Sequence, residues 1–161
     1  MKKLSYLFML LALSIVGCNE SAIINPDIQL NADKEAIRQF LEDNDITDYV
    51  EHSSGVFYRF IKEGTGTKPE LYHYVRVKYK GSLMDEDRTV FDESPTTDPP
   101  YSTFILSGVI AGWQIGLKLM PEGSKAVLYI PSSLAYGKVS SANIPANSNL
   151  EFEVELLDVI E

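Results

Sequence analysis

Cysteine and histidine are almost missing from this chain of 161 residues, which contains one cysteine and two histidines. A single cysteine, Cys18, excludes an intrachain disulfide framework and a metal site built from several cysteines. The histidines, His52 and His73, have no other metal-binding residue at ligand spacing, so we interpret both as surface residues. The sequence therefore predicts neither a bound metal nor a cofactor.

Positive charge is also scarce. The chain has 14 Lys and Arg against 23 Asp and Glu, a formal net charge of −9. An acidic chain of this kind is repelled by phosphate backbones, which argues against nucleic acid as a partner. The hydrophobic fraction of 45% is high enough for a real core, so we expect one globular domain with extensions.

A targeting segment opens the chain. Lys2 and Lys3 precede an apolar run over residues 4–16, which is shorter than the roughly 20 residues of a membrane-spanning helix. The run ends in "IVGC", residues 15–18, which resembles the lipobox of bacterial lipoproteins. The resemblance implies that Cys18 carries lipid at the start of the mature chain. An ordinary signal peptide with a chance cysteine is the alternative.

A short amphipathic helix is predicted in "ADKEAIRQFLEDN", where Ile37, Phe40 and Leu41 form an apolar stripe. Asn31 or Asp33 is the expected N-cap. The stripe could bind a partner or form a homodimer, or it could pack on the protein's own domain. We favour packing on the domain.

Strand patterns follow from residue 55 onward. "YVRVKYKG" and "LEFEVELLDVI" alternate apolar and polar residues, with the three glutamates of the second expected to face outward. "GVFYRFIK" is β-prone, and "KAVLYI" is continuously apolar, as in a strand covered on both sides. Several strands and one good helix predict an α+β domain in which an antiparallel sheet wraps around that helix.

The good helix lies within "FILSGVIAGWQIGLKLMPEG", because apolar residues recur there at steps of three and four. Ser107 is the expected N-cap of this helix. Gly112 and Gly116 share a face and predict a close approach to the sheet. Trp113, the only tryptophan, is either a core residue or the floor of an apolar pocket, and its spacing does not decide between them.

Three fragments in order, "VKYKGSLMDEDRTVFDES", "LSGVIAGWQIGLKLMPEGSKAVLYIPSSLAYG" and "IPANSNLEFEVELLDV", resemble the FKBP-type peptidyl-prolyl cis-trans isomerases. The resemblance covers residues 55–161 and implies an antiparallel half-barrel around one short helix. The leader and first helix resemble FKBP-type lipoproteins of Bacteroidetes-like bacteria. We divide the chain into a signal peptide (1–17), a tether (18–31), an N-terminal helical extension (32–54) and an isomerase domain (55–161).

The resemblance also assigns a pocket, residue by residue. It implies catalytic roles for Asp92, Tyr136 and Trp113, with Trp113 as the floor. The residues it implies for substrate binding are Tyr79, Phe91, Phe104, Val109, Ile110, Ile144 and Phe152. Two departures concern the pocket rim: Ser102 stands where some members have phenylalanine, and "SPTTDPPYS" lacks an arginine that some members carry.

The function implied is rotation about X–Pro bonds in extracytoplasmic proteins, with proline-containing polypeptides as substrates and macrolides of the rapamycin type as inhibitors. The lipid places the protein in the cell envelope, on the periplasmic or outer-membrane side. A peptide-binding folding chaperone with weak turnover is the alternative function. A purely structural lipoprotein is a third hypothesis, and it predicts no affinity for peptides.

Overall fold

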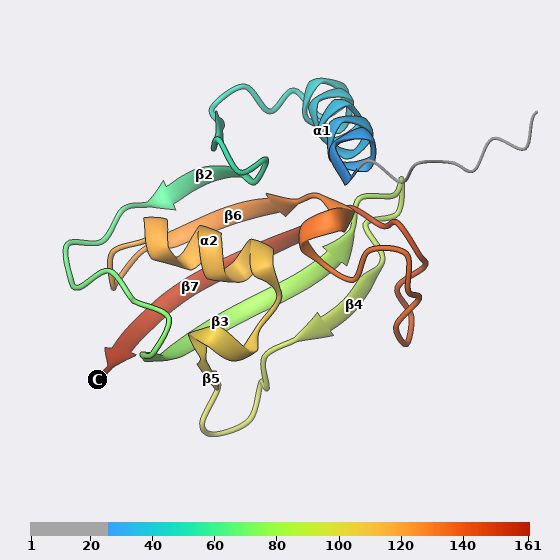
Figure 1. The fold of residues 1–161 in the computed structure, drawn as a ribbon. Helices are drawn as coiled ribbons and strands as arrows, with labels where there is room; N and C mark the ends of the chain where they lie inside the picture. Colours follow the sequence, from blue (N-terminus) through green and yellow to red (C-terminus); the bar gives the residue numbers. More distant parts are fainter. Residues whose placement is uncertain (1–25) are drawn as a thin grey trace, which may run out of the picture.

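One antiparallel sheet organises the protein, and the computed structural model describes residues 26–161 (Figure 1). The elements are α1 (Pro26–Asp43), β1 (Val50–Glu51), β2 (Phe57–Lys62), β3 (Tyr74–Leu83), β4 (Val90–Glu93), β5 (Ser102–Ile105), η1 (Leu106–Gly108), α2 (Ala111–Leu119), β6 (Lys125–Ile130), η2 (Ser132–Leu134) and β7 (Leu150–Ile160). The strand order is β1-β2-β6-β7-β3-β4, and β5 also pairs with β3. This is the predicted α+β architecture.

The helix α2 lies across one face of the sheet, in front of β6 and β7 in Figure 1. The alternating strands point their apolar residues at it: Val75 and Val77 from β3, and Val154 from β7, are fully buried. Leu117 of α2 joins the same cluster. The period-two pattern of these strands therefore correctly predicted which side chains face the helix.

Two glycines let α2 approach β6. A Cβ atom on Gly112 would lie 2.2 Å from Cγ2 of Ile130, and one on Gly116 would lie 2.6 Å from Cδ1 of Leu128. Real Cβ atoms do not come so close to another carbon, so any larger residue would push the helix off the sheet. The predicted close approach is confirmed, and what fills the space is β6 side chains rather than backbone.

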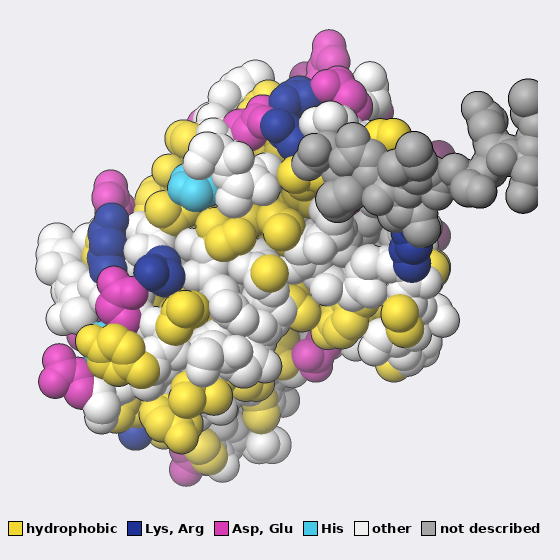
Figure 2. Space-filling model, viewed as in Figure 1, with side chains coloured by type: hydrophobic (Ala, Val, Ile, Leu, Met, Phe, Trp, Pro, Cys, Tyr) yellow, Lys and Arg dark blue, Asp and Glu magenta, His cyan; other side chains and the backbone are white. Residues whose placement is uncertain are grey.

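The opposite face of the sheet carries α1. Ile37 and Leu41 are fully buried against Phe57 of β2 and against Val127 and Tyr129 of β6. The strand β6 is therefore covered on both sides, as its continuous apolar sequence predicted. Charged side chains of both signs gather over α1 in Figure 2, which fits a helix whose apolar stripe is used within the chain.

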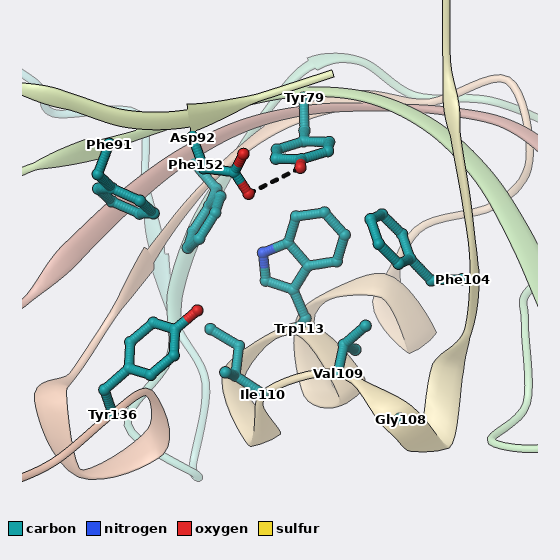
Figure 3. Close-up of a pocket in the computed structure, with 10 residues that line it drawn as sticks. All are labelled: Tyr79, Phe91, Asp92, Phe104, Gly108, Val109, Ile110, Trp113, Tyr136 and Phe152. Atoms are coloured by element: carbon teal, nitrogen blue, oxygen red, sulfur yellow. Dashed lines mark hydrogen bonds between the residues drawn. The ribbon is translucent and has the colours of Figure 1, made fainter. Parts of the chain in front are cut away.

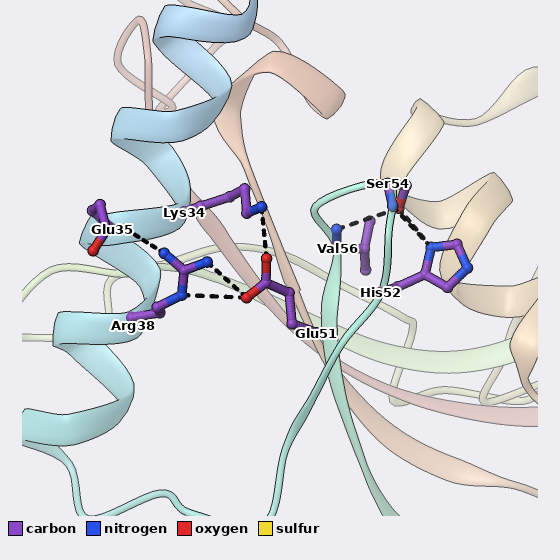
Figure 4. A network of polar contacts seen from close by, with 7 residues as sticks. All are labelled: Lys34, Glu35, Arg38, Glu51, His52, Ser54 and Val56. Carbon is purple, nitrogen blue, oxygen red and sulfur yellow. Dashed lines mark hydrogen bonds and ion pairs between the residues drawn. The ribbon is translucent and has the colours of Figure 1, made fainter.

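An ion-pair network also fastens α1 to β1 (Figure 4). Glu51 accepts contacts from Nζ of Lys34 at 2.6 Å and Nη2 of Arg38 at 2.7 Å, and Arg38 also contacts Glu35. Burial opposes ionisation of Glu51, but its hydrogen bonds to Lys34 and Arg38 outweigh burial and hold its pKa below the ordinary value. The carboxylate of Glu51 is thus the centre of this contact.

Both predicted helix caps are wrong. The first helix begins at Pro26 rather than near residue 32, because proline suits a first helical turn, and Asn31 and Asp33 lie inside it. The second helix begins after Ile110, which makes no side-chain cap hydrogen bond. Ser107 instead belongs to η1, a separate short turn that precedes the helix.

Two polar residues expected at the surface are buried. His73 is enclosed, and its Nδ1 accepts the backbone N–H of Glu70 at 3.0 Å. Glu151 belongs to the outward-facing set of β7, but burial shields its carboxyl group and raises its pKa. Its partner is Arg88, whose Nη1 lies 3.4 Å from Oε1 of Glu151. Alternation gives the face of a strand, and it does not say what covers that face.

The predicted signal peptide, Cys18 and the first part of the tether lie outside the described residues. Within residues 26–161, no helix combines the length and the hydropathy that crossing a bilayer requires.

Candidate active site

A pocket of about 340 Å³ opens on the face of the sheet that carries α2 (Figure 3). Its walls come from β3, β4, β5, the segment from the end of η1 into α2, β7 and the turn after η2. The lining residues are Tyr79, Phe91, Asp92, Phe104, Gly108, Val109, Ile110, Trp113, Tyr136 and Phe152. Nine of the ten predicted pocket residues are among them, so the structure brings together residues spread over more than seventy positions of the chain.

Trp113 lies at the centre of this pocket, and three aromatic rings hold it. Its ring meets those of Tyr79, Phe104 and Phe152 edge to face, with centroid separations of 5.2, 5.7 and 5.2 Å. Only 4% of the residue is exposed, so it belongs to the core and to the pocket floor at once. Edge-to-face pairs fix ring orientation, and the floor is therefore preformed.

The indole N–H of Trp113 has no hydrogen-bond partner within residues 26–161. In Figure 3 its nitrogen is turned toward the side of the pocket where Phe152 lies. A buried tryptophan usually finds an acceptor. In the described part of the chain this N–H is therefore a buried donor without an acceptor, beside the pocket.

One hydrogen bond organises the polar side of the pocket. Oη of Tyr79 on β3 donates to Oδ2 of Asp92 on β4 at 2.8 Å. Burial, and then the hydrogen bond to Asp92, raise the pKa of Tyr79, so the phenol stays protonated and remains a donor. Asp92 is the only charged residue in the lining, and its side of the pocket is open to solvent.

A backbone donor stands at the start of α2. Among residues 26–161, no protein acceptor pairs with the N–H of Ile110, which belongs to the unpaired first turn of a helix. Gln114 fixes its direction: Nε2 of Gln114 donates to the carbonyl of Val109 at 2.8 Å and to that of Ser107 at 3.3 Å. Because the Val109 carbonyl and the Ile110 N–H share one planar peptide, holding the first orients the second.

Gln114 was missed by the sequence reasoning. Its signal was weak: a polar residue one turn into the helix, on the side that faces the preceding loop. Apolar periodicity draws attention to the buried face of a helix and passes over such a residue.

Tyr136 closes the pocket opposite Tyr79 and Asp92. It lies in the turn after η2, is 40% exposed, and points its hydroxyl into the pocket in Figure 3. The turn is held by the carbonyl of Ser132, which accepts the N–H groups of Ala135 at 3.0 Å and Gly137 at 2.9 Å. The hydroxyl of Tyr136 is therefore a second donor, placed on a rigid turn.

Ile144 is the predicted pocket residue that does not line the pocket. It is 5% exposed and packs in the core, and its backbone N–H and carbonyl both pair with Ser141. This pairing closes the loop between Gly137 and β7. The structure gives Ile144 a role in supporting the rim, and its substrate contact stays a prediction.

The arrangement suits binding of a small apolar group with a carbonyl beside it. The floor and walls are mostly aromatic and aliphatic, with a backbone N–H and a phenol O–H at the edge. In the described part of the chain, no group of three or more His, Cys, Asp and Glu side chains could hold a metal ion. What this pocket offers is an apolar surface and hydrogen bonds.

Comparisons with known proteins agree with this geometry. The profile of the family described as "FKBP-type peptidyl-prolyl cis-trans isomerase" matches residues 65–157. The isomerase FkpA of Aeromonas hydrophila is 41% identical over 145 residues, which cover 86% of this chain and 53% of that protein. The outer membrane protein MIP of Legionella longbeachae is 42% identical over 107 residues, which cover 66% of this chain and 45% of that protein.

A crystal structure of a peptidyl-prolyl cis-trans isomerase from Pseudomonas syringae pv. tomato is similar in fold. Its TM-score is 0.68 at 34% identity, and the match covers 81% of this chain and 96% of that one. The chain spans about half the length of the curated relatives it matches. The matched segment and the pocket that it builds show that the chain belongs to the family of FKBP-type peptidyl-prolyl cis-trans isomerases.

Proposed function

We propose that this protein catalyses cis-trans isomerisation of X–Pro bonds in polypeptides. The observation that carries the proposal is the preformed apolar floor of Trp113, framed by three aromatic rings and edged by two hydrogen-bond donors. Rotation about an X–Pro bond makes and breaks no covalent bond. It requires only that the twisted amide be stabilised relative to the planar one.

The physical basis is the loss of amide resonance. Rotation has a barrier of about 18–20 kcal/mol because the planar amide gives up its partial double bond. The twisted amide has less charge separation, so an apolar pocket favours it over the planar form, which water solvates better. Phe152 and Trp113 would supply that surface to a proline ring.

Two donors would hold the substrate in place. The N–H of Ile110, aimed by Gln114, would bind a substrate carbonyl, and the hydroxyl of Tyr136 would bind a second acceptor. Asp92 would act through Tyr79, because their hydrogen bond orients the phenol that forms one wall of the pocket. The solvent-exposed position of Asp92 weakens any direct effect of its charge.

The test is the cis-to-trans conversion of a short X–Pro peptide in the presence of the purified full-length chain in mild detergent. The uncatalysed conversion takes tens to hundreds of seconds, so acceleration is easy to see. We expect a rate proportional to protein concentration. A folded protein that leaves the rate unchanged would overturn the proposal. Suppression of aggregation without acceleration would support the chaperone, and absence of peptide affinity would support a structural lipoprotein.

The proposed location is the cell envelope, with a lipid on Cys18 as anchor. The "IVGC" sequence after an apolar run supports it, and a relative carries the name outer membrane protein. Macrolides of the rapamycin type are proposed as inhibitors because the aromatic pocket could hold their ring. A homodimer through α1 has less support, since Ile37 and Leu41 are already buried within the chain.

A further inference from the structure

A buried carboxylate joins α1 to the segment that carries Tyr136. Asp33 lies inside α1 and is 3% exposed. Its Oδ2 accepts the hydroxyl of Ser132 at 2.7 Å and the backbone N–H of Ser133 at 3.2 Å, both in η2. Figure 1 shows η2 beside the N-terminal end of α1. Burying a carboxylate costs free energy unless it is hydrogen-bonded. The hydrogen bonds from η2 offset that cost for Asp33.

The rest of Asp33 is paired as well. Its Oδ1 accepts Nε2 of Gln29 at 2.8 Å, and its backbone carbonyl accepts Nδ2 of Asn149 at 3.3 Å. Oδ1 of Asn149 in turn accepts the backbone N–H of Ser132 at 2.9 Å. Ser132 is therefore held through its hydroxyl by Asp33 and through its N–H by Asn149.

Ser132 is also the support of the Tyr136 turn. Its carbonyl accepts the N–H groups of Ala135 and Gly137, which flank Tyr136 on both sides. One continuous set of hydrogen bonds thus runs from Asp33 through Ser132 to the two neighbours of a pocket residue. Apolar contacts of Ile37 and Leu41 also attach α1 to the sheet, so the hydrogen bonds of Asp33 are not the sole attachment of this helix.

We propose that Asp33 is a positioning residue for the active site, acting through Ser132 to fix the turn that presents Tyr136. The proposal rests on the isomerase function proposed above. Asp33 lies outside the matched residues 65–157, so α1 contributes to a site that the matched segment otherwise builds. Catalytic groups need supports that hold them within a fraction of an ångström. In this protein part of the support comes from the N-terminal helix.

The first test compares kcat/KM of full-length variants at a temperature where all are folded by circular dichroism. Asp33→Ala should lower kcat/KM about three- to ten-fold, the effect of one misplaced hydrogen bond. Asp33→Asn should retain most activity, because its carbonyl oxygen can still accept from η2 while the Gln29 amide rotates. Asp43→Ala is the matched control, since Asp43 is an exposed aspartate of the same helix bonded to Gln39.

A double-mutant cycle tests whether Asp33 affects activity through Tyr136. If Asp33 acts through Tyr136, Asp33→Ala combined with Tyr136→Phe should lose no more activity than Tyr136→Phe alone. Losses that multiply, or an Asp33→Ala variant as active as Asp43→Ala, would overturn the proposal.

Amide hydrogen exchange tests the positioning without any assay of turnover. Asp33→Ala should speed exchange at Ala135 and Gly137 and leave the amides of β7 unchanged, while Asp33→Asn should resemble the wild type. Equal protection of Ala135 and Gly137 in wild type and Asp33→Ala would overturn the proposal. A wild type without isomerase activity but with this exchange pattern would refute the proposed function and leave the positioning role standing.

Discussion

Oη of Tyr79 and Oδ2 of Asp92 lie 2.8 Å apart, on neighbouring strands at the edge of the pocket. This hydrogen bond joins the one charged group of the lining to a ring that packs on Trp113. The carboxylate of Asp92 is therefore linked to Trp113, at the pocket floor, through the side chain of Tyr79.

The first prediction separates the charge of Asp92 from its hydrogen bond. Asp92→Asn keeps an acceptor for Tyr79 and should retain most activity. Asp92→Ala removes the acceptor and should cost about 1 kcal/mol in kcat/KM, roughly five-fold. Steady-state kinetics on an X–Pro peptide decides. An Asn variant as impaired as the Ala variant would mean that the charge itself is required.

The second prediction concerns Trp113 as a fluorescent reporter. Binding of rapamycin or an X–Pro peptide should shift or quench the emission of Trp113, because this ring lines the pocket. The change can be assigned to the pocket because the sequence has no second tryptophan. Trp113→Leu should weaken binding measured by calorimetry and lower the free energy of unfolding by about 2–3 kcal/mol. Leu117→Val, a core change on the same helix away from the pocket lining, should lower stability and keep affinity. Unchanged emission with a bound ligand would contradict the pocket.

The third prediction tests whether Gln114 orients the backbone N–H of Ile110. Gln114→Leu keeps the side-chain size and removes both hydrogen bonds to the preceding loop. We expect kcat/KM to fall about three- to ten-fold with a small change in Tm. Gln39→Leu, the same substitution on the exposed part of α1, is the control and should leave kcat/KM unchanged. Full activity of Gln114→Leu would show that the loop holds its shape without the amide.

The fourth prediction is a pH dependence of stability. The pKa of Glu51 is lower in the folded protein than its ordinary value of 4.5, so its contribution is complete above that value. It is lost as the pH falls through the folded pKa. Tm should therefore drop further between neutral pH and acid in wild type than in Glu51→Gln. Glu42→Gln is the control, and a Glu51→Gln profile parallel to wild type would count against the ion-pair network.

The fifth prediction concerns the anchor. Cys18→Ser should abolish incorporation of a labelled fatty acid and release the protein from the membrane fraction. Ser21→Ala, three residues further on, should label as wild type does. Equal labelling of wild type and Cys18→Ser would rule out lipidation at Cys18.

Much of the pocket could be predicted because its residues lie in motifs that resemble those of a known family and occur in the same order, whereas alternation alone indicates only which face of a strand is buried. The alternation at Val75 and Val77 predicts that one face of the strand is buried, whichever element packs against it. Trp113 could not be assigned from spacing alone, because core and floor are compatible with the same period. The structure shows that it serves as both.

The polar connections could not be predicted, for a physical reason. Asp33 and Ser132 are 99 residues apart in the chain, and nothing local in "NADKEA" distinguishes a buried aspartate from a helix cap. Glu151 has the alternation of an exposed strand residue, and only the side chains packed over it make it buried. Hydrogen bonds between distant segments leave no periodic trace.

The position of β2 beside β6 has a consequence for any attempt to isolate the matched segment. Cutting the chain at residue 65 would remove α1, β1 and β2, and β6 would become an edge strand. Its sequence "AVLYI" would then present unpaired backbone groups and bare apolar side chains, the features that promote strand addition between molecules. We expect such a fragment to aggregate, so a well-behaved fragment of this protein must include β2.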